Sequence, residues 1–272
     1  MIASFLLYLA LGAVAGTAAG LFGIGGGAII VPILVLSFRA RGFGDSVLMQ
    51  LALGTSLASI IVTGASSVRA HHLLGNVVWP VVLRMAFGIV GGTLLGSVVA
   101  GHLDGALLIR VFTLFLVFVA IKMAWPRKPP SQRESRSPGI STMLGTGGAI
   151  GFVSALFGIG GGTMSVPFLN WLGLEMKQAV GTAAACGLPI AVSGAIGYAV
   201  MGWAHPDLPS YCVGYLYLPA WLGIILASSP SARWGARLAH RLPEQWLRRA
   251  FSALVMAIVL KLWFSASVPG SP

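Results

Sequence analysis

Charged residues are scarce in this chain. Of its 272 residues only 8% are Asp, Glu, Lys or Arg, and 57% are apolar. Soluble domains carry about a quarter charged residues. The composition therefore excludes an ordinary soluble domain.

Cysteine and acidic residues are also few. Cys186 and Cys212 are too far apart for a C-x-x-C motif, so we expect no metal site and no cofactor. All six acids fall at the ends of expected helices or in loops: Asp45, Asp104, Glu134, Glu175, Asp207 and Glu244. No carboxylate is therefore expected within the membrane to carry a proton or a sodium ion.

Long apolar stretches fill much of the remaining sequence. Each is long enough, or nearly so, to cross a hydrocarbon core of roughly 30 Å as a helix. They are Ser4–Phe22, Val77–Ala100, Leu107–Ala124, Tyr211–Ser229 and Ala250–Phe264. They predict a multi-pass protein of the cell (inner) membrane, in contact with the lipid bilayer. Because Met1–Phe5 has no basic residue, we expect no cleavable signal.

The net charge of +11 does not indicate nucleic-acid binding. Basic residues gather between apolar spans, above all in Lys122–Arg136. This distribution is the topology signal of membrane proteins. We therefore expect no nucleic-acid partner.

An internal repeat divides the chain. The stretch "GLFGIGGGAIIVPIL" (Gly20–Leu34) returns as "ALFGIGGGTMSVPFL" (Ala155–Leu169). Each copy is followed by a Gly-Thr segment, Ala52–Ala65 and Ala179–Ala195, and later positions match at a constant offset of 139. The repeat predicts a first half over residues 1–125, a basic cytoplasmic linker over 126–138 and a second half over 139–272.

Charge distribution predicts how the halves are oriented. If each half is a re-entrant helical hairpin plus three transmembrane helices, the halves are inverted, and twelve basic residues lie in the cytoplasm against four outside. Four full crossings per half would make the halves parallel, with seven inside and nine outside. The positive-inside rule favours the first arrangement. We therefore predict an all-α polytopic fold of two inverted repeats, with both termini outside.

The glycine runs are the candidate site. The second hairpin arms, Ala28–Phe38 and Thr163–Leu172, cover only about half a membrane at 1.5 Å per residue. Each turn would then lie near the bilayer midplane and open a helix whose first amides are unpaired, an arrangement suited to a small anion. The predicted ligands are the backbone amides of Gly25, Gly26, Gly27, Gly160, Gly161 and Gly162.

Hydroxyl side chains and one arginine extend this prediction. Thr55, Ser56 and Thr182 lie in the Gly-Thr segments, and their hydroxyls either donate to the same anion or bond their own helix carbonyls. Thr163 and Ser165 are weaker candidates of the same kind. Arg84 is the one cation that the charge count assigns to neither side of the membrane, and it either contacts substrate or extends to the lipid headgroups.

The paired "GIGGG…VP" loops, the Gly-Thr segments and the duplicated plan resemble the TauE/SafE family of membrane permeases. The resemblance covers residues 3–265. It implies a transporter, acting in export, of small sulfur-containing anions such as sulfite, sulfoacetate or thiosulfate. The implied ligands are the same loop glycines with Thr55 and Thr182. Ala183 stands where the first half has Ser56, so the implied site is asymmetric.

Two other functions stay open. One is a non-transporting membrane subunit. The other is an intramembrane hydrolase using Ser193 and His205, although His205 lies in an expected outer loop. We expect no enzyme activity and no catalytic residue. The anion, the driving ion, the direction of flux and homo-oligomer formation are not determined by the sequence.

Overall fold

The computed structural model describes residues 2–22, 27–124, 138–239 and five positions between 252 and 260. The first half contains α1 (Ile2–Phe22), α2 (Gly27–Ala40), α3 (Asp45–Leu73), α4 (Trp79–His102) and α5 (Gly105–Ala124). The second contains α6 (Ile140–Phe157), α7 (Gly162–Trp171), α8 (Met176–Met201), β1 (Cys212–Val213), β2 (Leu216–Tyr217) and α9 (Leu218–Ala239). Most of the linker and of the last expected span lies outside the described residues.

The described structure is nearly all helical, as the sequence predicts. Four of its helices, α3, α4, α6 and α8, are long and apolar enough to cross a membrane. Shorter apolar helices lie within α1, α2, α5 and α9. This is the architecture of a multi-pass helical membrane protein.

One expected span begins later than the sequence indicates. Residues from Tyr211 onward form a two-stranded antiparallel hairpin before α9 begins at Leu218. Gly214 turns this hairpin with φ +53°, and Tyr211 also has a positive φ of 68°. These backbone angles are incompatible with a continuing right-handed helix.

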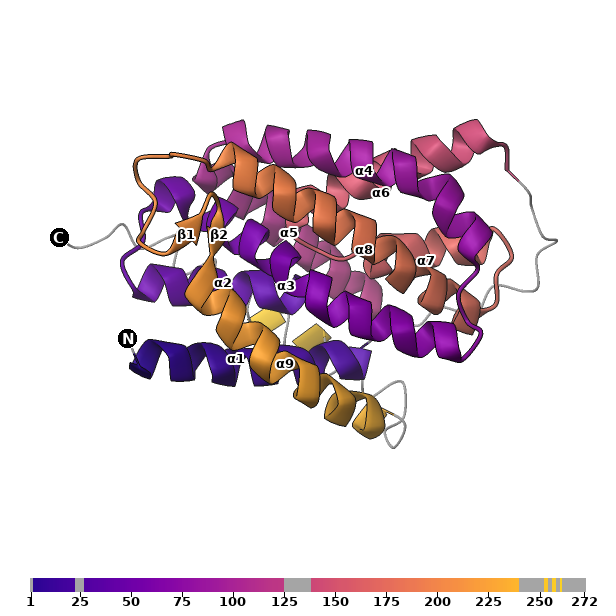
Figure 1. Cartoon of the computed structure of the whole chain (residues 1–272), viewed down its shortest axis with the longest axis horizontal. Coiled ribbons are helices and arrows are strands. Elements are labelled where there is room, and N and C mark those ends of the chain that lie inside the picture. The colour runs from indigo at the N-terminus through magenta and orange to yellow at the C-terminus, as the bar shows by residue number, and fades with distance from the viewer. Residues whose placement is uncertain are drawn as a thin grey trace.

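Helices α3 and α8 occupy the centre of the molecule (Figure 1). They run antiparallel: Leu57 of α3 contacts Gly194 of α8, whereas Gly64, further along α3, contacts Leu188, earlier in α8. Helices α4 and α6 pack together on one side of this pair, and α1 and α9 on the other (Figure 1).

In each outer helix pair, a glycine from the first helix of one half packs against the backbone of a helix from the other half. A Cβ built on Gly12 of α1 would lie 2.8 Å from the Ile224 carbonyl oxygen of α9. A Cβ on Gly147 of α6 would lie 2.7 Å from the Met85 carbonyl oxygen of α4. Each glycine therefore lets one half's first helix approach the other half's backbone.

The Gly-Thr segments also form a reciprocal pair of contacts. The Tyr217 amide donates to Thr55 Oγ1 at 3.0 Å, and the Val78 amide donates to Thr182 Oγ1 at 3.0 Å. Tyr217 and Val78 are separated by the repeat offset of 139 residues. The two contacts are therefore equivalent under the sequence repeat, with the halves exchanged.

An aromatic cluster holds the end of α2. Arg41 Nη1 donates to the Tyr8 hydroxyl at 2.9 Å. The guanidinium lies 5.5–5.7 Å from the ring centroids of Tyr8, Phe43 and Tyr217. The cluster thus ties the first hairpin to β2 of the other half through cation–π contacts.

We predict that Gly92→Ala destabilises the fold and that Gly91→Ala does not. A Cβ at Gly92 would overlap the Gly148 carbonyl of α6, whereas a Cβ at Gly91 meets nothing within 4 Å. Overpacking costs about 1–3 kcal/mol. Thermal unfolding in detergent should give a lower melting temperature for Gly92→Ala only. Equal melting temperatures would contradict the α4–α6 packing.

Candidate functional site

The second glycine run ends one helix and begins another. Helix α6 ends at Phe157, and Gly158 caps it in the left-handed region with φ +60°. Helix α7 begins at Gly162 and has ten residues, about 15 Å of rise. It therefore covers about half of a hydrocarbon core. Helix α2, at 14 residues, is also short of a full crossing.

The beginnings of α2 and α7 lie close together. A Cβ on Gly27 would be 2.5 Å from the Gly158 carbonyl oxygen and 2.8 Å from the Cα of Ile159. The first residue of α2 thus touches the loop that leads into α7. Gly25 and Gly26 lie outside the described residues, so their part in the site stays a prediction.

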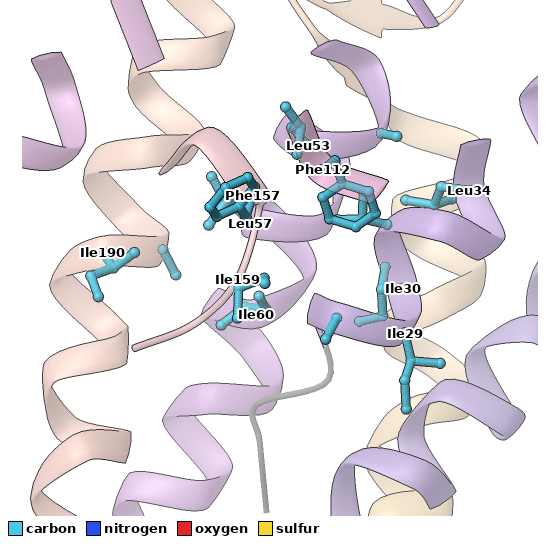
Figure 2. Close-up of a cluster of buried hydrophobic side chains, with 14 of the residues drawn as sticks. Ile29, Ile30, Leu34, Leu53, Leu57, Ile60, Phe112, Phe157, Ile159 and Ile190 are labelled. Carbon is cyan, nitrogen blue, oxygen red and sulfur yellow. The ribbon is translucent and has the colours of Figure 1, made fainter. Parts of the chain in front are cut away.

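The second glycine loop and the first residue of α2 lie beside the middle of the long central helices. A Cβ on Gly160 would be 3.3 Å from Ile60, near the middle of α3. A Cβ on Gly161 would be 2.9 Å from Ile190, near the middle of α8. Figure 2 shows Ile60 and Ile159 between Ile190 of α8 and Ile30 of α2. Because α3 and α8 are spanning candidates, this position corresponds to the interior of the membrane.

The start of α7 leaves backbone donors unpaired. In the described part of the chain, the first amide here with a backbone acceptor is that of Ser165, which donates to the Gly161 carbonyl at 2.8 Å. The amides from Gly160 to Met164 have no backbone acceptor there. Gly160 and Gly161 are themselves buried. Buried amides normally have a partner, so this loop can accept a ligand with lone pairs.

The electrostatics of the described loops favour an anion. None of the residues that a side chain at Gly27 or Gly158–Gly161 would meet is charged. The available charge is the positive end of the α7 dipole, equivalent to roughly half an elementary charge. In a low-dielectric surrounding this attracts an anion more strongly than it would in water.

The predicted hydroxyl ligands have different surroundings. Ser56 Oγ donates to the Gly158 carbonyl at 2.9 Å, so Ser56 holds the loop in place. Thr55 and Thr182 accept the hydrogen bonds between the halves described above. Thr163 is half-buried in the first turn of α7. Whether any of these contacts a substrate stays a prediction.

Arg84 is not brought together with the other candidates. It lies on an exposed face of α4. The next residue, Met85, packs on Gly147 in the first part of α6, whereas the glycine loop follows the end of α6. This location fits a side chain that extends toward the headgroups.

Sequence reasoning missed two residues that border the loops. Ile60 lies within 3.3 Å of Cβ positions built on both Gly27 and Gly160, and a Cβ on Gly187 would be 3.5 Å from the Gly161 nitrogen. Both residues belong to apolar helices with no distinguishing motif. A superposition of the repeats could have aligned them, because each follows its Gly-Thr pair by the same number of residues.

The fold defines a class of multi-pass helical membrane protein in which short apolar helices pack beside longer, spanning candidates. Comparison with known proteins narrows this class. The family model described as sulfite exporter TauE/SafE matches residues 8–262. The chain therefore belongs to the TauE/SafE family.

Similar proteins are named as transporters. A probable membrane transporter protein of Haemophilus influenzae is 38% identical over 97% of this chain and 99% of its own length. One of Methanocaldococcus jannaschii is 30% identical over 92% of this chain and 91% of its own. YunE of Bacillus subtilis, a probable membrane transporter protein, is 27% identical over 95% of both chains. No solved structure matches.

We predict that Ser56→Ala destabilises the protein more than Ser59→Ala. Both serines are fully buried on α3, but Ser59 donates to the Thr55 carbonyl of its own helix. Loss of Ser56 removes the hydrogen bond to the buried Gly158 carbonyl, at a cost of about 1–3 kcal/mol. Thermal melts of the two variants measure the difference. Equal losses would mean that Ser56 does not hold the loop.

Proposed function

We propose that this protein exports small sulfur-containing anions, such as sulfite, sulfoacetate or thiosulfate, across the membrane. The anion binds between the starts of α2 and α7. The observation that carries the proposal is the run of amides at the start of α7 that have no backbone acceptor among the described residues. Its first two residues, Gly160 and Gly161, are buried beside the middle of two spanning candidates. Broken helices whose ends face a midplane site are a recurrent design in transporters.

Inverted repeats are part of this proposal. The antiparallel contact of α3 with α8 supports them, because these helices carry the two equivalent Gly-Thr segments. The reciprocal contacts of Thr55 and Thr182 support them independently. In such a fold two similar conformations, open to opposite sides, can exchange around one central site.

The positions of acidic residues favour an anion over a cation. Asp45 begins α3, Glu175 caps α8, and Asp104 and Asp207 lie between helices. None of these described carboxylates borders the loops. A cation would therefore meet the positive helix end without a compensating charge, which is unfavourable in a low-dielectric site.

The hydrolase alternative finds no support in the described residues. Ser193 Oγ donates to the Pro189 carbonyl of its own helix at 2.5 Å. His205 lies beyond the end of α8, where its Nδ1 accepts from the Asp207 amide at 3.3 Å. A serine nucleophile needs a base within hydrogen-bond reach.

The non-transporting alternative is tested by flux through the purified protein alone.

We predict that Gly161→Val abolishes anion binding and flux while the protein stays folded. The two tightest contacts of the added Cβ are with movable side-chain ends, Ile190 Cδ1 at 2.9 Å and Ser165 Oγ at 3.0 Å, and the Ala183 carbonyl oxygen lies at an ordinary 3.6 Å. The new side chain nevertheless covers the loop amides. Sulfite binding by calorimetry and sulfite flux in proteoliposomes measure the effect. Gly145→Val is the control, since a Cβ there meets nothing within 4 Å. Unaltered flux in Gly161→Val would end the proposal.

A further inference from the structure

Ser165 carries a buried hydroxyl that has no partner among the described residues. Its side chain is 0% exposed, and its Oγ has no hydrogen-bond partner among the described residues. It lies in the first turn of α7, 3.0 Å from a Cβ position built on Gly161. A buried hydroxyl without a partner lowers stability. Such a group beside amides that lack an acceptor indicates a ligand that accepts a hydrogen bond from the Ser165 hydroxyl.

Gly187 leaves space in front of the same amides. It lies on α8, and a Cβ there would be 3.5 Å from the Gly161 nitrogen. Any larger side chain would point at the loop where a ligand atom must approach. Ser165 and Gly187 therefore border Gly161 from two different helices.

The corresponding positions in the first half are apolar. The repeat aligns Ser165 with Ile30 and Gly187 with Ile60. Ile60 lies 3.1 Å from a Cβ on Gly27 and 3.3 Å from one on Gly160, between the two helix starts. Ile30 is 3% exposed and belongs to the same cluster (Figure 2). The two sides of the site thus differ in chemistry.

We propose that the substrate site has one polar side, on which the Gly161 amide and the Ser165 hydroxyl bind the oxyanion, and one apolar side formed by Ile60. This inference rests on the proposed function and refines its substrate class. The preferred substrate carries its charged oxygens at one end and an apolar group at the other, so sulfoacetate, which is charged at both ends, is the least favoured of the anions named above. An anion with oxygens on all sides would have to leave water for contact with Ile60, which is unfavourable.

A matched pair of anions tests this directly. Methanesulfonate has a methyl group where sulfate has a fourth oxygen, and it carries one negative charge where sulfate carries two. We expect the purified protein to bind methanesulfonate more tightly than sulfate. Ser165→Ala and Gly187→Ala should each weaken methanesulfonate binding by about tenfold or more. The first removes a charge-assisted hydrogen bond, and the second places a methyl group in front of the Gly161 amide. Ile60→Thr should narrow the preference for methanesulfonate over sulfate.

Three control variants separate these effects from general destabilisation. Gly148→Ala adds a methyl 3.6 Å from the Gly88 carbonyl oxygen, away from the loops. Ser37→Ala removes another buried hydroxyl without a described partner, and Ile89→Thr changes a buried isoleucine of α4. All three should bind both anions as the unaltered protein does. Melting temperatures of all six variants report folding.

The outcomes distinguish the two levels of the proposal. The two-sided site would be rejected by equal affinity for the two anions, by a preference for sulfate, or by unchanged binding in Ser165→Ala and Gly187→Ala. The proposed anion transport would remain. If the unaltered protein bound neither these anions nor sulfite, the proposed function would fail and this inference with it.

Discussion

The backbone amides at the start of α7, which have no backbone acceptor among the described residues, impose the main constraint on this structure. Lipid offers no hydrogen-bond acceptor, so irregular backbone at that depth is stable only when it is enclosed by protein or faces a polar ligand or water. The loop before α7 is enclosed by α3 and α8, yet its amides from Gly160 to Met164 have no backbone acceptor in the described part of the chain. The same feature that makes this backbone costly to bury makes it suitable for an anion.

The rest of the fold serves to hold that backbone in place. Small residues such as Gly12 and Gly147 let the outer helices approach closely. Each Gly-Thr segment also accepts a hydrogen bond from the other half, Thr55 from the amide just before α9 and Thr182 from the amide just before α4. Ser56 fixes the Gly158 carbonyl. Positional precision therefore comes from close packing and a few buried hydrogen bonds, with no ion pair at the described loops.

The sequence predicted the helical membrane class and the two half-length helices because apolar length and glycine runs are local signals. It placed the second arms within about two residues of α2 and α7. The hairpin at β1 and β2 was missed, since positive backbone angles at Tyr211 and Gly214 are not visible in an apolar stretch. Ile60 and Gly187 were missed for another reason: their importance arises only where α3 and α8 meet the loops, a tertiary contact without a sequence motif.

An anomalous-scattering structure with selenite, a heavier analogue of sulfite, tests the central claim most directly. The account predicts a selenium peak between the starts of α2 and α7, within hydrogen-bonding distance of the Gly161 amide. Selenium found only at the ends of the helices, with the two loops closed over an empty or lipid-filled space, would contradict it.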